Sequence, residues 1–359
     1  MAVRDRGAGM TGPRILVVGC GAIGGVVAAH LLEIGQDVSV LTTNADIARA
    51  LSESGVRVRG EGAPAATMKP VTIHRELPTD VAPFDYVLLA TQPPQVEAAA
   101  NSALPALAPT GRMVCFQNGL CEERVAKLAG AERVVGAVVA WGASMVEPGV
   151  YDRTSAGGFS IGRLDGQIDE PLEDLGRVLE AVGPVSMTQN LLGARWSKLA
   201  INCAISTLGT IGGDRLGTLM RQRHVRRLAL EVMTEVVAVA RAEEVHLEKV
   251  SGTLDLDWIA LTEAERTAAG SPGLLAKHTL LLAVGARYRR LRSSMLSAIE
   301  RGRAPAVDFL NGEITSRGKE HHVATPVNAA ARDSVWAIAR GEQTASHATL
   351  RKLYDATRS

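Results

Sequence analysis

The chain has 359 residues, which is long for one domain and typical of two. Hydrophobic residues make up 46% of the sequence and charged residues 21%, as in an ordinary globular protein. The 39 Lys and Arg residues nearly balance the 38 Asp and Glu residues, so the composition argues against a basic surface for nucleic acid or for an anionic membrane.

The N-terminal half alternates buried strands with helices. Residues 1–12 carry no apolar segment, and we expect a disordered tail there rather than a signal peptide. Arg14–Gly19 is a continuous apolar run, which is typical of a parallel strand buried on both faces. A helix with an apolar stripe follows and ends at Gly35, and Asp37–Leu41 predicts a second strand.

Strands and helices continue to alternate up to about residue 188. Further strands are expected at Val56–Val58, Pro70–Ile73, Asp85–Ala90, Arg112–Phe116 and Val134–Ala140. Helices are expected at Val96–Leu107 and Glu122–Leu128, and a late hairpin or edge pair at Tyr151–Gly162. This order predicts an α/β Rossmann-type doubly wound sheet over residues 13–188.

Residues 189–359 have helical periodicity, which predicts an all-α C-terminal domain. The expected helices are Ala194–Ile211, Val225–Glu243, Leu274–Leu282, Arg287–Arg301, Asp308–His321 and Val327–Arg340. Ser251–Gly273 is less regular, and we expect a loop with short helices there. No apolar run approaches the roughly 18 residues that span a membrane, so we expect no membrane association.

The cysteines give no sign of a metal site. They are scattered along the chain, without zinc-site spacing, at Cys20, Cys115, Cys121 and Cys203. We expect reduced, mostly buried thiols in a cytoplasmic protein.

The turn after the first strand is rich in glycine and reads Gly19-Cys20-Gly21-Ala22-Ile23-Gly24. The first glycine permits a tight turn, the second lets backbone amides approach a pyrophosphate, and the third allows close packing of helix on strand. The helix N-terminus then favours the anion. Strand, turn, helix and second strand together predict a dinucleotide site, and a chance cluster of glycines is the alternative.

The end of the second strand bears on the choice of cofactor. NAD-specific sites usually place an acidic residue there to hold the ribose hydroxyls. Here the sequence is Leu41-Thr42-Thr43-Asn44, which offers hydrogen-bond donors and no carboxylate, and Arg49 one turn later could add positive charge. We therefore favour NADP over NAD. A plain turn with Asn44 or Thr43 as the helix N-cap is an alternative that is compatible with this role.

Two further segments carry candidate site residues. Asn118-Gly119 follows a strand at its carboxyl end, the edge that faces the ligand in an open α/β sheet, although Asn-Gly could also be only a turn. Lys198, Asn202 and Ser206 are spaced by four and share one face of an apolar helix. Spacing alone does not decide whether this polar stripe faces solvent or lines a polar cleft.

These motifs together resemble the ketopantoate reductase (2-dehydropantoate 2-reductase) family, over Ile15 to about Arg340. The resemblance rests on Gly19-Cys20-Gly21-Ala22-Ile23-Gly24, Asn118-Gly119, Lys198-Leu-x-x-Asn202, Ser293-Ser294-Met295-Leu296 and Asp308-Phe-Leu-Asn311-Gly312. The resemblance implies an NADPH-dependent reductase of a 2-oxo acid, acting in pantothenate biosynthesis, with a homodimer as a further expectation.

The resemblance also implies residue roles. Lys198 would be the general acid that protonates the carbonyl oxygen, which suits a partly desolvated lysine whose pKa can fall. Asn118 and Asn202 would align Lys198 and the substrate oxygen. Ser294 would bind the substrate carboxylate, unless it is a helix serine that bonds only its own backbone. Asp308 and Ser206 complete the expected substrate-binding set.

The sequence departs from the family pattern at three positions. Ala306 stands where the family usually has a glutamate that helps to hold substrate, and Ser206 replaces a second helix asparagine. Gln92 replaces a common lysine after the fourth main strand and is kept as a cofactor-binding candidate. Hydride chemistry is therefore a firmer expectation than ketopantoate itself. Asp308 or Glu300 could supply the lost carboxylate from a neighbouring turn.

Two other functions remain open from sequence. One is an opine- or imine-type dehydrogenase on a similar two-domain scaffold. The other is a non-catalytic dinucleotide sensor, against which Lys198 argues because a sensor would not need a proton donor.

Overall fold

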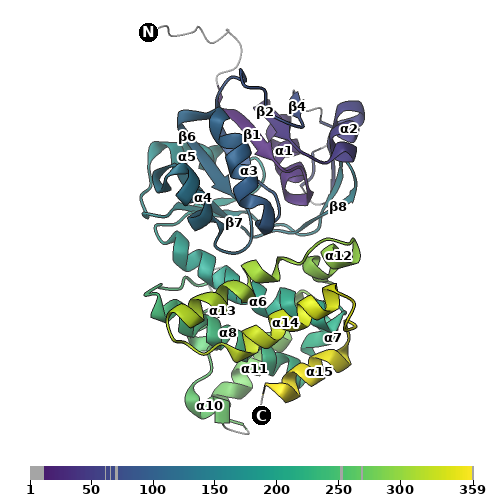
Figure 1. The fold of residues 1–359 in the computed structure, drawn as a ribbon, viewed down its shortest axis with the longest axis vertical. Coiled ribbons are helices and arrows are strands. Elements are labelled where there is room, and N and C mark those ends of the chain that lie inside the picture. The colour runs from purple at the N-terminus through teal and green to yellow at the C-terminus, as the bar shows by residue number, and fades with distance from the viewer. Residues whose placement is uncertain are drawn as a thin grey trace. The chain divides into compact units, whose positions relative to one another are not determined.

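The computed structural model describes residues 12–60, 62–64, 66–68, 72–250, 254–267 and 270–357. The chain divides into two compact units, Met1–Gln117 with Cys121–Leu191, and Asn118–Leu120 with Leu192–Ser359. Figure 1 labels many of the elements of both units. The expected tail at residues 1–12 lies outside the described residues except for Gly12.

The first unit contains a central sheet flanked by helices. Its central strands are β1 (Arg14–Val18), β2 (Asp37–Leu41), β4 (Thr72–His74), β5 (Phe84–Leu89), β6 (Leu107–Cys115), β7 (Val134–Val139), β10 (Phe159–Arg163) and β11 (Val185–Met187). Its helices are α1 (Ala22–Glu33), α2 (Ala45–Ser54), α3 (Val96–Ala103), α4 (Cys121–Ala129) and α5 (Glu170–Leu179), with short 3₁₀ turns η1 (Pro93–Gln95), η2 (Leu104–Ala106) and η3 (Ala131–Arg133).

Among the described residues, the strand order of this sheet is β11-β10-β7-β6-β5-β1-β2-β4. All neighbouring strands run parallel except β10 and β7, which are antiparallel. Ile15 and Val17 of β1 pack in one core cluster with residues of α1 and α5, whereas α3 packs on β5. The buried apolar runs in the sequence thus formed a parallel sheet, as predicted.

The expected hairpin at Tyr151–Gly162 is wrong, because its two strands belong to different sheets. β9 (Val150–Arg153) pairs with β3 (Arg57–Gly60) and β8 (Ala143–Glu147) in a small second sheet. β10 instead pairs with β7 in the central sheet. Of the strand expected at Pro70–Ile73, Pro70 and Val71 lie outside the described residues, and β4 begins at Thr72.

The second unit is helical. Its elements are α6 (Leu191–Gly212), α7 (Leu216–Met220), α8 (Arg223–Ala242), α9 (Leu256–Ile259), α10 (Glu263–Thr267), α11 (Pro272–Arg287), α12 (Ser294–Glu300), η4 (Ala306–Phe309), α13 (Asn311–Glu320), α14 (Pro326–Ala339) and α15 (His347–Ala356). α8 is the central helix, since it contacts α7, α9, α11, α13, α14 and α15. None of the helices in the described part of the chain combines the length and apolarity needed to cross a membrane.

Two helices expected in this unit are shorter than predicted. The helix expected at Arg287–Arg301 forms only from Ser294, because α11 ends at Arg287 and Ser293 caps a new helix. The helix expected at Asp308–His321 is split into η4 and α13.

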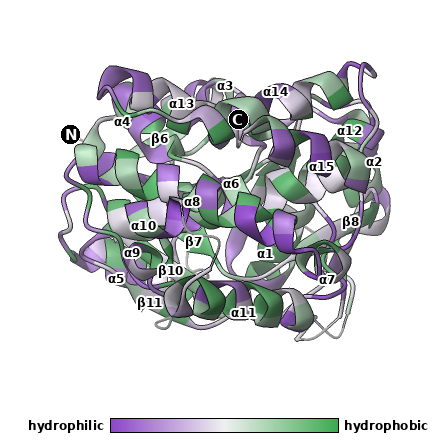
Figure 2. Cartoon of the chain, turned by 90° about the horizontal axis from the view of Figure 1, so that it is seen from below, coloured by the Kyte–Doolittle hydropathy of each residue, from purple (hydrophilic) through white to green (hydrophobic). Residues whose placement is uncertain are grey.

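On α11, Leu275 and Leu282 lie seven residues apart and are exposed, and Figure 2 shows hydrophobic residues along this helix.

One buried amide joins three elements of the helical unit. Asn311, at the start of α13, donates through Nδ2 to the carbonyl oxygen of Cys203 at 3.2 Å and to Oδ1 of Asn328 at 2.9 Å. Its Oδ1 accepts from the Thr207 hydroxyl at 2.5 Å. Cys203 and Thr207 belong to α6 and Asn328 belongs to α14, so Asn311 fixes both helices against α13.

A buried carboxylate from α8 extends this network. Glu235 accepts from the backbone N–H groups of Val327 and Asn328 and from Nδ2 of Asn328, each at 2.8 Å. Those N–H groups belong to the first turn of α14, whose N-cap Thr325 makes no side-chain cap bond. Glu235 therefore supplies from another helix the acceptors that a helix start requires. Burial raises the pKa of this carboxyl above its usual value.

We expect Glu235→Ala to destabilise the helical unit. It leaves two helix N–H groups and the Asn328 amide without their acceptor in a dry core, at about 1–3 kcal/mol for each unmatched group, so the free energy of unfolding should fall by about 3 kcal/mol or more. Chemical denaturation followed by circular dichroism measures the loss. Arg351→Ala removes an exposed ion pair with Asp355 and a surface contact with the Tyr354 ring, and it should leave the midpoint nearly unchanged. A midpoint for Glu235→Ala equal to that of the wild type would contradict this role.

Candidate active site

The glycine-rich turn joins β1 to α1, and each glycine has a distinct environment. Gly19 has a φ of +89°, which favours glycine, and its N–H donates to the Leu41 carbonyl at 2.8 Å. A Cβ on Gly24 would lie 2.0 Å from the Gly19 carbonyl oxygen, so only glycine allows this approach. A Cβ on Gly21, the N-cap of α1, would meet no atom within 4 Å.

This arrangement fits a dinucleotide diphosphate. The space beside the Gly21 Cα is open, and no side chain of Gly21 caps the first N–H groups of α1, which begins at Ala22. Unpaired N–H groups at the start of a helix, together with the helix dipole, bind anions. Cys20 lies between the glycines and is buried, and burial raises the pKa of its thiol to about 11, so the thiol stays protonated.

A tyrosine from the small sheet supports this turn, and sequence analysis did not identify it. The Tyr151 hydroxyl donates to the Cys20 carbonyl at 2.7 Å, and the side chain is completely buried. Its ring lies 2.2 Å from the point where a Cβ on Gly25 would stand. The two bonded residues are 131 positions apart, so no local pattern could have revealed the contact.

The end of β2 combines a helix cap with an ion pair. The Asn44 side chain accepts from the backbone N–H groups of Asp46 and Ile47, both at 3.0 Å, so Asn44 is the N-cap of α2. Thr43 is exposed. Arg49, considered above as an added positive charge, instead pairs with Asp46 at 2.7 Å.

Neighbouring strand ends bring further candidates to the same edge of the sheet. Thr42 is buried, and its N–H donates to the His74 carbonyl at 2.9 Å, which ties β2 to β4. Gln92 is exposed after β5, where it is the N-cap of η1. Gln117 after β6 donates to the Thr91 hydroxyl after β5 at 3.3 Å.

In the helical unit, α6 carries the polar stripe. Lys198 and Ser206 are half-buried, and Asn202 is only 9% exposed. Nδ2 of Asn202 has no hydrogen-bond partner among the described residues. Burial, and then the nearby Arg195 guanidinium, lower the pKa of Lys198 from 10.5. Of the two interpretations left open by spacing, these facts favour a polar interior face over a solvent face.

The start of α12 lies against this stripe. The Ser293 hydroxyl donates to the Ser206 carbonyl at 2.8 Å and lies 2.8 Å from the Thr210 hydroxyl. Ser293 also caps α12 by accepting from Leu296 N–H, whereas Ser294 is the exposed first residue of that helix. Sequence analysis chose Ser294 and overlooked Ser293, although a serine just before a helix is a common N-cap.

The loop after β6 belongs to the helical unit. Asn118 is exposed, and Leu120 packs in the helical core. Gly119 has a φ of +94°, and a Cβ on it would lie 2.7 Å from the Phe309 carbonyl oxygen. The Asn118-Gly119 segment therefore lies next to η4, the turn that contains Ala306.

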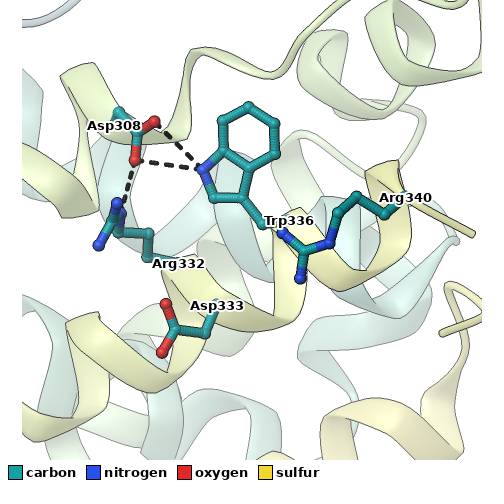
Figure 3. Close-up of a pocket in the computed structure, with 5 residues that line it drawn as sticks. All are labelled: Asp308, Arg332, Asp333, Trp336 and Arg340. Atoms are coloured by element: carbon teal, nitrogen blue, oxygen red, sulfur yellow. Dashed lines mark hydrogen bonds and ion pairs between the residues drawn. The ribbon is translucent and has the colours of Figure 1, made fainter. Parts of the chain in front are cut away.

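Both carboxylates considered as replacements for the missing family glutamate are already paired. Figure 3 shows Asp308 facing Arg332 and Trp336 of α14 at a surface pocket of about 450 Å³. Oδ1 of Asp308 accepts from Arg332 Nε at 2.5 Å, and both of its oxygens accept from Trp336 Nε1, at 3.2 and 3.1 Å. Glu300 binds Arg292 through two bonds of 2.8 and 2.5 Å.

Comparison with known protein families shows to which family the chain belongs. The family model "Ketopantoate reductase PanE/ApbA" matches residues 15–166, and its C-terminal model matches residues 190–338. The chain belongs to the ketopantoate reductase family. This confirms the resemblance seen in the sequence, and it makes the chain an NAD(P)-dependent oxidoreductase.

Relatives in this family match along nearly their whole length. A 2-dehydropantoate 2-reductase of Pyrococcus horikoshii is 24% identical over 335 residues, covering 92% of this chain and 98% of the relative. One from Caulobacter vibrioides is 28% identical over 325 residues, covering 88% and 95%.

Solved structures share the fold. A ketopantoate reductase of the family from Ralstonia eutropha JMP134 superposes with a TM-score of 0.75 at 26% identity, covering 92% of this chain and 99% of that one. A ternary structure of D-mandelate dehydrogenase with NADH and anilino(oxo)acetate gives a TM-score of 0.76 at 18% identity, covering 95% and 99%. The second likeness shows the fold alone. A Rossmann-type unit followed by a helical unit is thus the fold of this chain.

We expect Gly21→Asp to abolish dinucleotide binding in a folded protein. The new side chain has room, but its carboxylate would occupy and repel the diphosphate position. Gly21→Ala is the matched control and should bind far better than Gly21→Asp. Calorimetric titration with NADPH and NADH measures both variants. Wild-type affinity in a folded Gly21→Asp protein would refute this cofactor site.

Proposed function

We propose that the chain reduces a 2-oxo acid to the 2-hydroxy acid, with hydride from NADPH and a proton from Lys198. The observation that carries the proposal is the half-buried lysine on α6, whose pKa is lowered and which shares a helix face with Asn202. Bound NADPH supplies the hydride. In this proposal, residues 13–188 bind the dinucleotide and residues 189–359 provide substrate binding and the proton.

The other roles follow from the positions of the side chains. Asn202 has an amide nitrogen without a partner among the described residues, so it can donate to a substrate oxygen beside Lys198. Asn118 is proposed to hold the same oxygen. Ser294 is exposed at the start of α12, next to the Ser293 that contacts α6, and can donate to the substrate carboxylate. Ser206 completes the stripe, whereas the ion pair of Asp308 suits it to supporting η4 rather than to contacting substrate.

A lowered lysine pKa fits both directions of this reaction. Reduction needs the protonated amine, so its rate should fall as the pH rises through the pKa of Lys198, which lies below 10.5. Oxidation of the hydroxy acid needs the neutral amine and should rise over the same pH range. A lysine with an ordinary pKa would place both changes at more alkaline pH.

We expect Lys198→Met to lower kcat by about 10²- to 10⁴-fold, the usual contribution of a positioned general acid, with little change in NADPH affinity. Lys198→Arg is the matched control, since it keeps the charge but cannot release a proton near neutral pH. It should be as slow as Lys198→Met and should lose the alkaline fall in rate. Steady-state NADPH oxidation across pH measures all three proteins. Wild-type kcat in either variant would show that the proton comes from another group.

The substrate is proposed to be a 2-oxo acid related to ketopantoate but without its hydroxyl. The family glutamate is Ala306 here, and the two carboxylates that could replace it, Asp308 and Glu300, are in ion pairs. In this proposal, the position of the family glutamate therefore offers no acceptor for a substrate hydroxyl. An unpaired buried hydroxyl costs about 1–3 kcal/mol, so ketopantoate should react roughly five- to 150-fold less well than with that acceptor present.

We expect Ala306→Glu to raise kcat/KM for ketopantoate more than for its deoxy analogue. The added carboxylate would accept from the hydroxyl that only ketopantoate carries. Ala306→Leu, a bulky change without an acceptor, is the control for effects of size. Measuring both substrates on the three proteins, with and without added amine, also tests an opine-type reaction. An efficient wild-type ketopantoate reductase that the glutamate does not improve would refute this specificity.

Assembly and location complete the proposal. A homodimer is supported by the exposed Leu275 and Leu282, which share one face of α11. Analytical ultracentrifugation of the wild type and of Leu275→Glu tests it. The proposed location is the cytoplasm, where the four buried cysteines would stay reduced.

A further inference from the structure

Three strand ends are joined along one edge of the Rossmann sheet. The N–H of Gly19, which follows β1, donates to the carbonyl oxygen of Leu41 at the end of β2. The N–H of Thr42, which follows β2, donates to the carbonyl oxygen of His74 at the end of β4. Because β1, β2 and β4 run parallel, all three end at the edge where the glycine-rich turn lies. A dinucleotide held at that turn places its adenosine ribose toward the end of the second strand.

An arginine stands at the third of these ends. Arg75 directly follows β4, whose last residue His74 is in register with Leu41, so Arg75 comes level with Thr42. Its Nη2 donates to the Thr43 carbonyl oxygen at 3.3 Å. The guanidinium thus lies over the turn that leads from β2 into α2, although 32 residues separate it from Thr43 in sequence.

The charge of Arg75 is not matched within the part of the chain that the structure describes. No carboxylate there forms an ion pair with Arg75, and its one hydrogen bond goes to a neutral carbonyl. The nearby acid in the first turn of α2, Asp46, is paired with Arg49. The β2 end therefore presents an unmatched cation, and the acid in the first turn of α2 is already paired, which is a charge pattern that suits a phosphate better than a ribose diol.

We propose that Arg75 binds the 2′-phosphate of NADPH and sets the preference for NADPH over NADH. This rests on the proposed function. The planar guanidinium can donate two N–H groups to phosphate oxygens, and the exposed Thr43 next to it can add its hydroxyl. The existing bond to the Thr43 carbonyl holds the side chain near this position before any ligand arrives.

Binding measurements with matched ligands test the assignment. The probes are NADPH against NADH, and adenosine 2′,5′-bisphosphate against 5′-AMP, since each pair differs only in the 2′-phosphate. Arg75→Met should weaken NADPH and the bisphosphate by about 10- to 100-fold, as expected for a hydrogen-bonded charge pair. NADH and 5′-AMP should change by less than about twofold, because neither carries the group that Arg75 contacts.

Two variants serve as controls. Arg75→Lys keeps a point charge without the planar fork and should recover part of the lost affinity. Arg59→Met removes an exposed arginine from β3, in the small sheet, and should leave all four affinities unchanged. The difference between Arg75→Met and wild type should also shrink as ionic strength rises.

Three results would overturn the assignment: tighter wild-type binding of NADH than of NADPH, an equal loss for both dinucleotides in Arg75→Met, or a loss no larger than that of Arg59→Met. Its failure is separable from failure of the proposed reaction. A protein that loses its 2′-phosphate preference in Arg75→Met but reduces no 2-oxo acid would refute the reaction and leave the role of Arg75 supported.

Discussion

The helical unit depends on the side-chain amide of Asn311, because a buried amide must satisfy donor and acceptor groups with fixed geometry. Asn311 meets this requirement by bonding α6 on one side and Asn328 of α14 on the other. Asn328 in turn reaches Glu235 of α8. Hydrophobic packing alone would let α6 rotate or slide by small amounts. These directional bonds fix the face that carries Lys198.

The Rossmann unit fixes its candidate site mainly with backbone groups, to which the Tyr151 hydroxyl adds one buried side-chain bond. Its edge is fixed by parallel register, by the two backbone bonds between strand ends, and by the close approach of Gly24 to the Gly19 carbonyl. Any side chain at residue 24 would separate helix from strand. One unit therefore relies mainly on backbone groups and on the absence of side chains, and the other relies on buried polar side chains. This difference suits the charged dinucleotide and the small substrate that are proposed for the two units.

Sequence alone predicted what local patterns encode. β1, β2 and β5 were predicted because strands buried on both faces give continuous apolar runs. The turn from Gly19 to Gly24 was predicted because a tight turn and close packing of helix on strand require glycine at fixed positions. Pairing partners were not encoded locally, so β9 and β10 were joined wrongly. The break before α12 was missed because the segment around Ser293 keeps a helical pattern until its serine caps a new helix.

The candidate site likewise contains features that sequence patterns predict and features that they do not. The stripe from Lys198 to Ser206 follows from spacing, but its burial does not, because burial depends on what surrounds the helix. Tyr151, Ser293 and Arg75 act through bonds that span 131, 87 and 32 residues. Such contacts exist only after the sheet and the helices have formed, so no motif could have revealed them, although Ser293 itself belongs to the Ser293-Ser294-Met295-Leu296 motif.

The contact between Tyr151 and the glycine-rich turn makes two distant positions interdependent. The tyrosine ring fills the space that a side chain at residue 25 would need. A homologue that acquires alanine at residue 25 must therefore carry a smaller residue at position 151, and it then gives up the hydroxyl that holds the Cys20 carbonyl. The glycine-rich turn therefore cannot be moved into another protein on its own. A chimera that receives residues 14–41 without the strand that carries Tyr151 would inherit the glycines but not the support that keeps them in shape.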